Sequence, residues 1–182
     1  MNDLNLISSC KKGEKEAFEK LIEKYYLPLH KFFYKNTGNE KLCEDLTHET
    51  VIKLIENVDK FNPVMGAKFS TWLFRIAYNT YVDYLRKNGR IKNTPLESVE
   101  LTLESDYDLQ NSIIKNEERE YLHLRINALP ENMKILITLR YLNGFGYSEI
   151  SKITGIGKAK VKSRLHYAME KLRALYQMKE VQ

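Results

Sequence analysis

The sequence predicts an all-α protein with two small helical domains joined by a flexible acidic linker. Apolar residues recur at three-and-four spacing through most of the chain, as in amphipathic helices. Gly-containing turn signals separate these periodic segments. The periodicity is lost in NTPLESVELTLESDYDLQ, which has a proline, many acids and few regularly spaced bulky groups. We therefore predict domains at residues 8–92 and 112–178, with the linker at 93–111.

Composition favours an anionic partner and a reducing compartment. The 182 residues carry 29 Lys and Arg against 24 Asp and Glu, a formal net charge of +5. Cys10 and Cys43 form no CxxC pair, so neither a zinc ribbon nor a disulfide framework is indicated. The chain starts without the pattern of a signal peptide, and no apolar stretch is long enough to span a bilayer. We expect a cytoplasmic protein that does not itself insert into a membrane.

Two helices are predicted before residue 60. The first covers Lys15 to Tyr34, where Pro28 predicts a kink or short break near Tyr26 and Gly38 a C-terminal cap. The second covers Glu40 to Val58. Its apolar stripe leaves a polar face that is either solvated or a docking face for a larger partner: Asp45, His48, Glu49 and Lys53.

The stretch from Phe61 to Lys87 combines a turn-forming loop with a helix that begins near Thr71. The helix carries Trp72, Phe74, Tyr78, Tyr81 and Tyr84, interleaved with Lys68, Arg75, Arg86 and Lys87. Cations beside aromatic rings can hold a phosphate backbone while exposed bases stack. The alternative is an amphipathic helix with buried rings and solvated cations.

The last three predicted helices include a helix-turn-helix. They cover Glu131 to Leu142, Tyr147 to Thr154 and Lys158 to Tyr176, with Gly155-Ile156-Gly157 as the tight turn. Apolar side chains are spaced to hold the last two helices together: Ile150, Ile153, Ile156, Val161 and Leu165. The final helix begins with cations, as expected for a helix that enters the major groove. A solvated basic face is the alternative.

A protein with both features would bind duplex at one point and a separated strand at another, as promoter opening requires. The chain resembles the extracytoplasmic-function (ECF) group of small alternative sigma factors, within the sigma-70 family. The resemblance covers nearly the whole sequence and rests on four segments, in this order: GEKEAFEKLIEKYYLPL, EDLTHETVIKLIENVDKF, FSTWLFRIAYNTYVDYLRK and LPENMKILITLRYLNGFGYSEISKITGIGKAKVKSRLHYAMEKLRAL.

The resemblance implies a sigma region 2 bundle at 8–92 and a region 4 helix-turn-helix at 112–178. It implies that core RNA polymerase binds through the clamp helices of its largest subunit and through its flap. The residues that match the clamp-binding segment are Asp45, Leu46, His48, Glu49 and Ile52. The family usually has glutamine at the position of His48 and phenylalanine at that of Val51.

The resemblance also implies recognition of both promoter elements, and an anti-sigma factor as a further partner. For the −10 element it indicates a base-flipping pocket and its supports, which match Phe61, Lys68, Ser70, Trp72, Arg75, Asn79 and Arg86. For the −35 element the matching residues are Tyr147, Ser148, Lys158, Lys160, Lys162, Ser163, Arg164 and His166.

Two other classes of protein compete with this interpretation. A helix-turn-helix regulator that binds operator DNA without being a polymerase subunit would account for the second half of the chain alone. A metal-dependent nuclease is disfavoured because the four histidines are scattered and no HExxH motif occurs. We expect no cofactor, no metal site and no catalytic residue.

Overall fold

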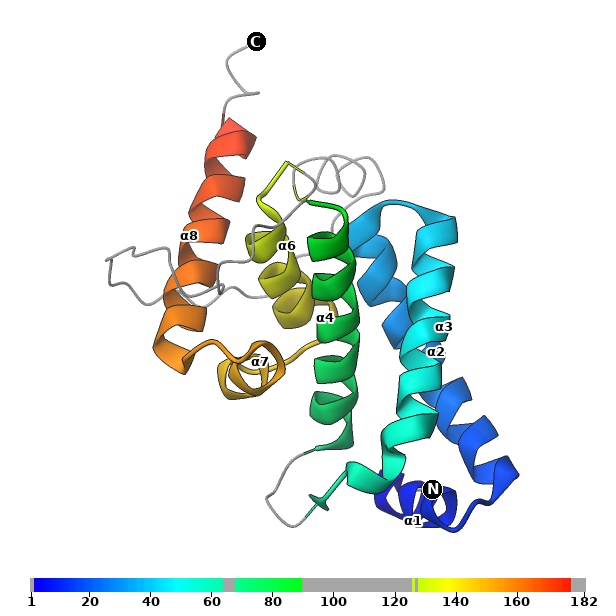
Figure 1. Cartoon of the computed structure of the whole chain (residues 1–182). Coiled ribbons are helices and arrows are strands. Elements are labelled where there is room, and N and C mark those ends of the chain that lie inside the picture. The colour runs from blue at the N-terminus through cyan, green and yellow to red at the C-terminus, as the bar shows by residue number, and fades with distance from the viewer. Residues whose placement is uncertain (1, 64–67, 90–125, 127, 178–182) are drawn as a thin grey trace.

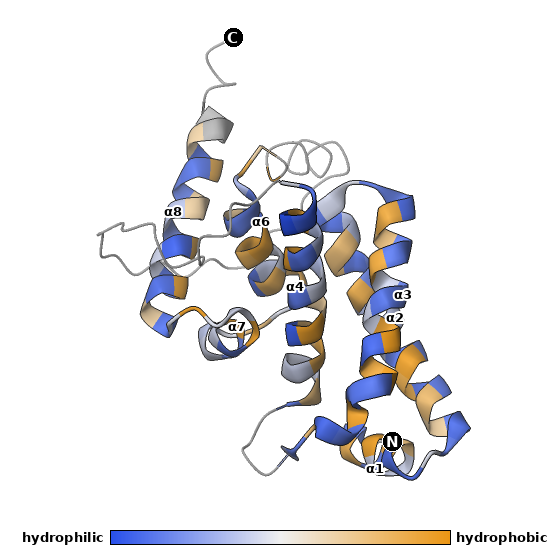
Figure 2. Ribbon diagram, viewed as in Figure 1, coloured by the Kyte–Doolittle hydropathy of each residue, from blue (hydrophilic) through white to orange (hydrophobic). Residues whose placement is uncertain are grey.

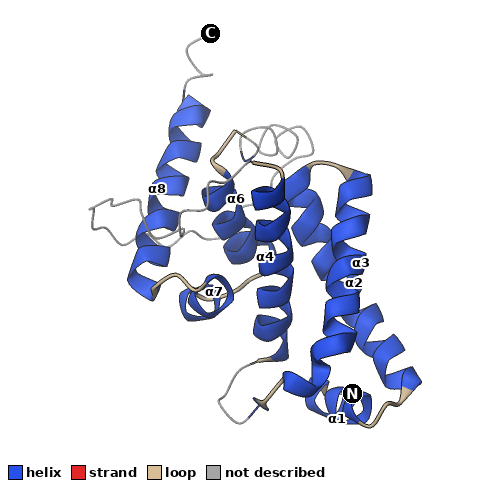
Figure 3. Cartoon of the chain, viewed as in Figure 1, coloured by secondary structure: helices blue, strands red, loops and turns tan. Residues whose placement is uncertain are grey.

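The computed structural model describes residues 2–63, 68–89, 126 and 128–177, and side chains as far as residue 174. All regular structure in these ranges is helical, which confirms the predicted fold class (Figure 3). The predicted linker and the helical pattern expected from Ser112 to residue 125 lie outside the described residues. Each helix carries both hydrophilic and hydrophobic residues (Figure 2). The helices with their bounds are α1 (Asp3–Lys11), α2 (Lys15–Thr37), α3 (Glu40–Asn57), η1 (Val58–Lys60), α4 (Phe69–Lys87), α6 (Glu131–Ile137), η3 (Thr138–Leu142), α7 (Tyr147–Thr154) and α8 (Lys158–Gln177).

A tight turn joins α2 to α3 and makes them neighbours. Gly38 adopts a left-handed conformation with φ 63°, as the predicted C-terminal cap of α2 requires. The Asn39 side chain then accepts a hydrogen bond from the backbone N–H of Leu42 at 2.9 Å, which caps the start of α3. The two helices run side by side (Figure 1).

The helix α2 continues through Pro28, so of the kink or short break predicted near Tyr26 the break does not occur. Proline removes one backbone hydrogen bond and disfavours a helix interior. Here Tyr25 and Leu29 are buried on either side of it, and Phe32 and Phe33 follow one turn later. Burial of both halves of α2 on the same core outweighs the local cost of the proline.

The short helix α1 was not anticipated from the sequence. It buries Leu6, Ile7 and Cys10, a stripe too short to stand out as a periodic segment. The Lys11 ammonium donates to the backbone carbonyls of Asp59 at 3.0 Å and Phe61 at 2.7 Å. This lysine therefore fixes the chain just before the loop that precedes α4.

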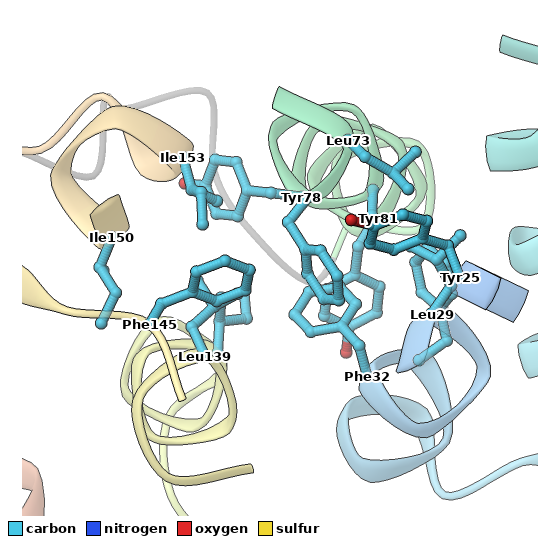
Figure 4. Packing of buried hydrophobic residues seen from close by; sticks show 14 of the residues in the cluster. Tyr25, Leu29, Phe32, Leu73, Tyr78, Tyr81, Leu139, Phe145, Ile150 and Ile153 are labelled. Atoms are coloured by element: carbon cyan, nitrogen blue, oxygen red, sulfur yellow. The ribbon is translucent and has the colours of Figure 1, made fainter. Parts of the chain in front are cut away.

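Aromatic rings from α2 and α4 form the core of the N-terminal half, residues 2–89. Phe32 contacts Phe33 edge-on at 5.2 Å between ring centroids and Phe74 at 5.7 Å. Tyr81 lies 6.5 Å from both Phe32 and Phe33 and is fully buried. These rings fill the space between α2 and α4 (Figure 4).

Aliphatic side chains hold the C-terminal half, residues 126–177. The five predicted to join α7 to α8 are all buried, which confirms the helix-turn-helix packing: Ile150, Ile153, Ile156, Val161 and Leu165. Gly155 supplies the left-handed turn with φ 76°. The helix predicted at Glu131–Leu142 is interrupted, because its last five residues form a π-helical turn instead.

The two halves pack against each other. The helix α4 lies beside α7 as well as beside α3, so it occupies the centre of the molecule (Figure 1). No helix in the described ranges is long and apolar enough to cross a membrane.

Candidate polymerase and promoter interfaces

The outer side of α3 presents carboxylates next to exposed apolar groups. We call it the α3 face: Asp45, His48, Glu49, Ile52 and Ile55. Ile52 is 55% exposed, and Glu49 pairs with Lys53 within the helix at 2.6 Å. The fifth predicted contact residue, Leu46, is 3% exposed and belongs to the core. The face combines negative charge with unburied aliphatic surface, which suits a protein partner.

Three rings anchor the segment on both sides of residues 64–67. Phe61 lies before that gap, and Phe69 and Trp72 lie after it. Their centroids are 5.3 to 5.6 Å apart. Phe61 is buried and Trp72 partly buried, whereas Lys68 is exposed and Ser70 half-buried. The ring contacts therefore hold the residues on the two sides of the gap close together.

The exposed side of α4 is polar rather than aromatic. Arg75, Asn79 and Arg86 are exposed as predicted, and Asp83 lies 3.6 Å from Arg86. Phe74, Tyr78 and Tyr81 are buried, so these rings are not available for base stacking in this conformation. Of the two interpretations that the sequence left open for this helix, these three rings match the amphipathic one, with buried rings and exposed cations. Val82, one turn before Arg86, is also buried.

The start of α8 displays lysines. Lys158, Lys160 and Lys162 are exposed, and the first turn contains no acid. The Ser163 hydroxyl donates to the Lys160 carbonyl at 3.2 Å, whereas Arg164 is buried. His166 is half-buried beside Glu170 at 3.4 Å. An exposed basic helix start after a tight turn has the geometry to approach phosphates and base edges.

The predicted −35 residues of α7 lie at its N-terminus. Ser148 is exposed, and Tyr147 is half-buried with the Arg140 guanidinium 4.8 Å from its ring centroid. The predicted −35 residues of α7 and α8 therefore lie in the C-terminal half, and the predicted −10 residues lie in the N-terminal half.

Glu149, which sequence reasoning did not select as a site residue, links these two sets. Its carboxylate accepts from the Gly146 N–H at 2.9 Å and pairs with Lys68 at 3.0 Å. Partial burial opposes its ionisation, yet these two partners hold the pKa of Glu149 below its usual range. Its position three residues after Gly146 is a recognisable capping pattern. The pairing with Lys68 joins residues of the two halves that are far apart in the sequence, so no local sequence pattern predicts it.

A metal-dependent nuclease would need acidic and histidine side chains gathered around a metal ion. In the part of the chain that the structure describes, no group of three His, Cys, Asp or Glu side chains is placed to hold a metal ion.

The chain thus carries an acidic and apolar face on α3 and a basic helix start on α8, the two kinds of surface expected of a DNA-binding protein with a protein partner. Sigma-70 region 2 matches residues 21–91, and Sigma-70 region 4 matches residues 119–172. The ECF RNA polymerase sigma factor SigW of Bacillus subtilis is 29% identical over 175 residues, which cover 92% of each chain. The chain belongs to the sigma-70 family of RNA polymerase sigma factors, in its ECF group.

Solved structures show the same fold. The structure of CnrH in complex with the cytosolic domain of CnrY matches with a TM-score of 0.71 at 21% identity, over 97% of this chain and 98% of that one. The sigma factor RpoE in complex with the anti-sigma factor NepR, from Bartonella quintana, matches with a TM-score of 0.66 at 23% identity, over 89% and 98%. The protein is an alternative sigma factor, which binds core RNA polymerase, recognises −35 and −10 promoter elements and initiates transcription.

Proposed function

We propose that the two halves divide promoter recognition between them, with region 2 at residues 8–92, a linker at 93–111 and region 4 at 112–178. The α3 face binds the clamp helices of the polymerase largest subunit, and region 4 contacts the flap. The exposure of Asp45, His48, Glu49 and Ile52 supports this assignment. Leu46 contributes by holding α3 on the core.

The loop between Phe61 and Lys68 captures a base of the separated −10 strand. Extrusion of a base costs a few kcal/mol of stacking, which a preformed site has to offset. The ring cluster beneath the loop supports such preorganisation, because Phe61, Phe69 and Trp72 fix both loop ends. Ser70, Arg75, Asn79 and Arg86 continue the surface along the strand.

The −35 element is contacted by α8 and by the N-terminus of α7. The exposed ammonium groups of Lys158, Lys160 and Lys162 meet phosphates, Ser163 follows in the same helix, and Ser148 is exposed at the start of α7. Arg164, Tyr147 and His166 are at least half-buried and position these helices. Phosphate contacts supply affinity without sequence information, and base edges supply specificity.

The observation that carries this proposal is the acidic and apolar α3 face on the same chain as a basic helix start. An operator-binding regulator needs only the second of these surfaces. The chain acts without catalysis of its own and in the cytoplasm, where its polymerase and DNA partners are. A protein that sequesters it, as NepR is bound to RpoE, is a further expected partner.

Run-off transcription with core polymerase and mapping of start sites tests the function. We expect accurate starts that depend on the added chain, with the α3 double variant Asp45→Lys, Glu49→Lys as the matched loss-of-binding control. Specific duplex binding by the purified chain without polymerase, together with no specific starts in its presence, would favour the operator-binding regulator instead.

A further inference from the structure

The short helix α1 lies before residue 21, where the match to Sigma-70 region 2 begins. Its apolar residues Leu6, Ile7 and Cys10 are buried in the same core as those of α2. The helix packs on α2 and on η1, at the end of the molecule where α4 begins (Figure 1). Since η1 leads directly into the loop between Phe61 and Lys68, which we call the −10 loop, α1 lies next to the start of that loop.

The C-terminal end of α1 is bonded to the chain just before the −10 loop. The helix α3 continues directly into η1, and the last carbonyl groups of a helical segment have no partner within it. The Lys11 ammonium donates to two such carbonyls, that of Asp59 at 3.0 Å and that of Phe61 at 2.7 Å. A cation is also favoured at this end by the helix dipole. One side chain therefore fixes the direction in which the chain leaves η1.

The N-terminal end of α1 is connected to the other side of the same loop. The Tyr25 hydroxyl of α2 donates to an Asp3 carboxylate oxygen at 2.7 Å, and the Lys24 ammonium pairs with the same carboxylate. The Tyr25 ring in turn lies edge-on to Phe69, the first residue of α4, with centroids 5.4 Å apart. The two ends of α1 thus contact the two flanks of the −10 loop, one directly and one through Tyr25.

Ring contacts between the two flanks complete this connection. Phe61, whose carbonyl binds Lys11, lies 5.3 Å from Phe69 and 5.6 Å from Trp72 between ring centroids. Phe61 and Phe69 are buried, so a shift of either flank disturbs the packing of the other. A site that is held in its binding geometry beforehand loses less conformational entropy when it binds. Support of both flanks therefore favours capture of an extruded base.

We propose that α1 is a support for the −10 loop and that Lys11 is the positioning residue at its centre. The inference rests on the proposed role of the loop between Phe61 and Lys68 in base capture. It adds to promoter recognition two residues that lie before the region 2 match, Lys11 directly and Asp3 through Tyr25. Neither has to contact DNA. Loss of this support weakens selection of the −10 bases and leaves polymerase binding intact, because Lys11 bonds to the chain after α3 and not to the α3 face.

The variant Lys11→Met tests this role, since it keeps the length of the side chain but removes the donor to both carbonyls. Its holoenzyme is compared with the wild-type holoenzyme on a promoter mapped by run-off transcription and on copies with single-base changes in the −10 non-template strand. We expect core binding to stay within about twofold. Open-complex formation on the mapped promoter should fall about three- to tenfold, as for loss of hydrogen bonds to one or two carbonyls. The ratio between mapped and altered promoters should fall with it.

Two outcomes separate this inference from the proposed function. Equal −10 discrimination by Lys11→Met and by the wild-type chain would overturn the role of Lys11 and leave the role of the loop standing. A wild-type holoenzyme that does not distinguish the mapped promoter from its altered copies would refute the role of the loop, and the inference with it.

Two matched variants distinguish the bonds of Lys11 from its charge. Lys12→Met removes the neighbouring exposed lysine and should leave −10 discrimination unchanged. Lys11→Arg retains a cation with several N–H donors and should recover at least about half of the open complexes that Lys11→Met loses. An equal defect in Lys12→Met, or no recovery by Lys11→Arg, would contradict the proposal.

The single tryptophan of the chain gives a readout that needs neither DNA nor polymerase. Trp72 is partly buried and lies against Phe61, so its quenching by acrylamide reports on the packing of the loop flanks. In the free full chain we expect Lys11→Met and Asp3→Asn each to raise the quenching constant by about half, as for a local opening, with Lys12→Met unchanged. Urea denaturation of the same samples verifies that the variants are folded. Unchanged quenching in both folded variants would show that α1 does not support the flanks and would overturn the proposal.

Discussion

The hydrophobic cores of the two halves of this sigma factor are built from different kinds of residue. Rings fill the core of region 2, with Phe32, Phe33 and Tyr81 among its fully buried side chains. Aliphatic groups fill region 4, where Ile150 and Val161 join the helices of the helix-turn-helix. A large ring fills more volume per residue, so loss of one leaves a larger cavity. A single buried ring therefore contributes more to the core of region 2 than a single aliphatic group does to the core of region 4.

Their DNA-facing surfaces differ as well. The exposed side of α4 alternates Arg75, Asn79, Asp83 and Arg86, a mixture of cation, amide and acid. The start of α8 shows only cations among its exposed charged residues, namely Lys158, Lys160 and Lys162. A uniform positive surface attracts phosphate irrespective of sequence, whereas mixed polar groups discriminate. We infer that α8 contributes more to affinity and α4 more to selectivity.

The largest expected effect is on the ring-filled core. Phe32→Ala should lower the free energy of unfolding by about 3–5 kcal/mol, because the cavity left by a buried ring is not refilled. Urea denaturation measures the change. Leu27→Ala in the same helix is the control, since Leu27 is 56% exposed and should change stability by no more than about 0.5 kcal/mol. Similar losses for both would refute the core assignment.

The second-largest effect is expected from charge reversal on the α3 face. The double variant Asp45→Lys, Glu49→Lys should weaken binding to core polymerase at least about tenfold, because like charges across an interface are strongly unfavourable. Competition for core enzyme against a labelled wild-type chain gives the ratio. Glu16→Lys with Glu19→Lys, exposed on α2, is a charge-matched control. Unchanged competition by the α3 variant would exclude that face.

A smaller and more selective effect is expected at Asn79. Asn79→Ala should leave polymerase binding unchanged and reduce open-complex formation about tenfold, in line with loss of a polar contact to a base or strand. Permanganate reactivity of the melted −10 region reports open complexes. Asn5→Ala, an exposed asparagine of α1, is the matched control. If polymerase binding falls in parallel, Asn79 acts on assembly and not on melting.

A substitution of Lys160 tests the difference between the DNA-facing surfaces of α8 and α4. Lys160→Ala should weaken binding of the assembled holoenzyme to promoters with different −35 sequences by a similar factor. It should also reduce the slope of log affinity against log salt by about one. Salt-dependent binding titrations provide both quantities, with Lys20→Ala on α2 as the control. A loss confined to one −35 sequence would show that Lys160 contacts a base.

The smallest effect concerns pH. Partial burial opposes ionisation of Asp3, but hydrogen bonds from Lys24 and Tyr25 hold the pKa of Asp3 below its usual 3.8. A carboxyl with a lowered folded-state pKa adds stability above the unfolded pKa, and that stability disappears as pH falls through the folded value. Asp3→Asn should therefore cost at most about 1 kcal/mol at pH 7 and less near pH 2. Denaturation at both pH values tests this, and equal losses would contradict it.

Much of the fold was predictable because its signals are local. Helix bounds such as Tyr147–Thr154, the Gly38 cap and the five aliphatic contacts of the helix-turn-helix follow from spacing and turn chemistry. The helix α1 was missed because three apolar residues do not establish a period. The predicted break at Pro28 failed because burial on both sides of that residue is a tertiary effect.

The candidate site also has features that the sequence could predict and features that it could not. The exposure of the α3 carboxylates and of the α8 lysines follows from amphipathic periodicity, since charged side chains stay in water. The periodicity of α4 could not show that both of its flanks are covered. The sequence left open whether its rings stack on bases or are buried, and the structure shows Phe74 and Tyr81 packed on Phe32 of α2 and Phe74 packed on Phe145 of the C-terminal half.

By itself, the sequence determined that the chain is helical, that its two halves carry different surfaces, and that they belong to a sigma factor. These properties depend on residue type and on spacing within a few turns. Only the tertiary structure decided that Leu46 and Phe61 are buried, that Lys11 fixes the start of the −10 loop, and that Lys68 meets Glu149. These contacts join segments that are far apart in the sequence. Which of these segments meet is decided by the packing of all the helices together.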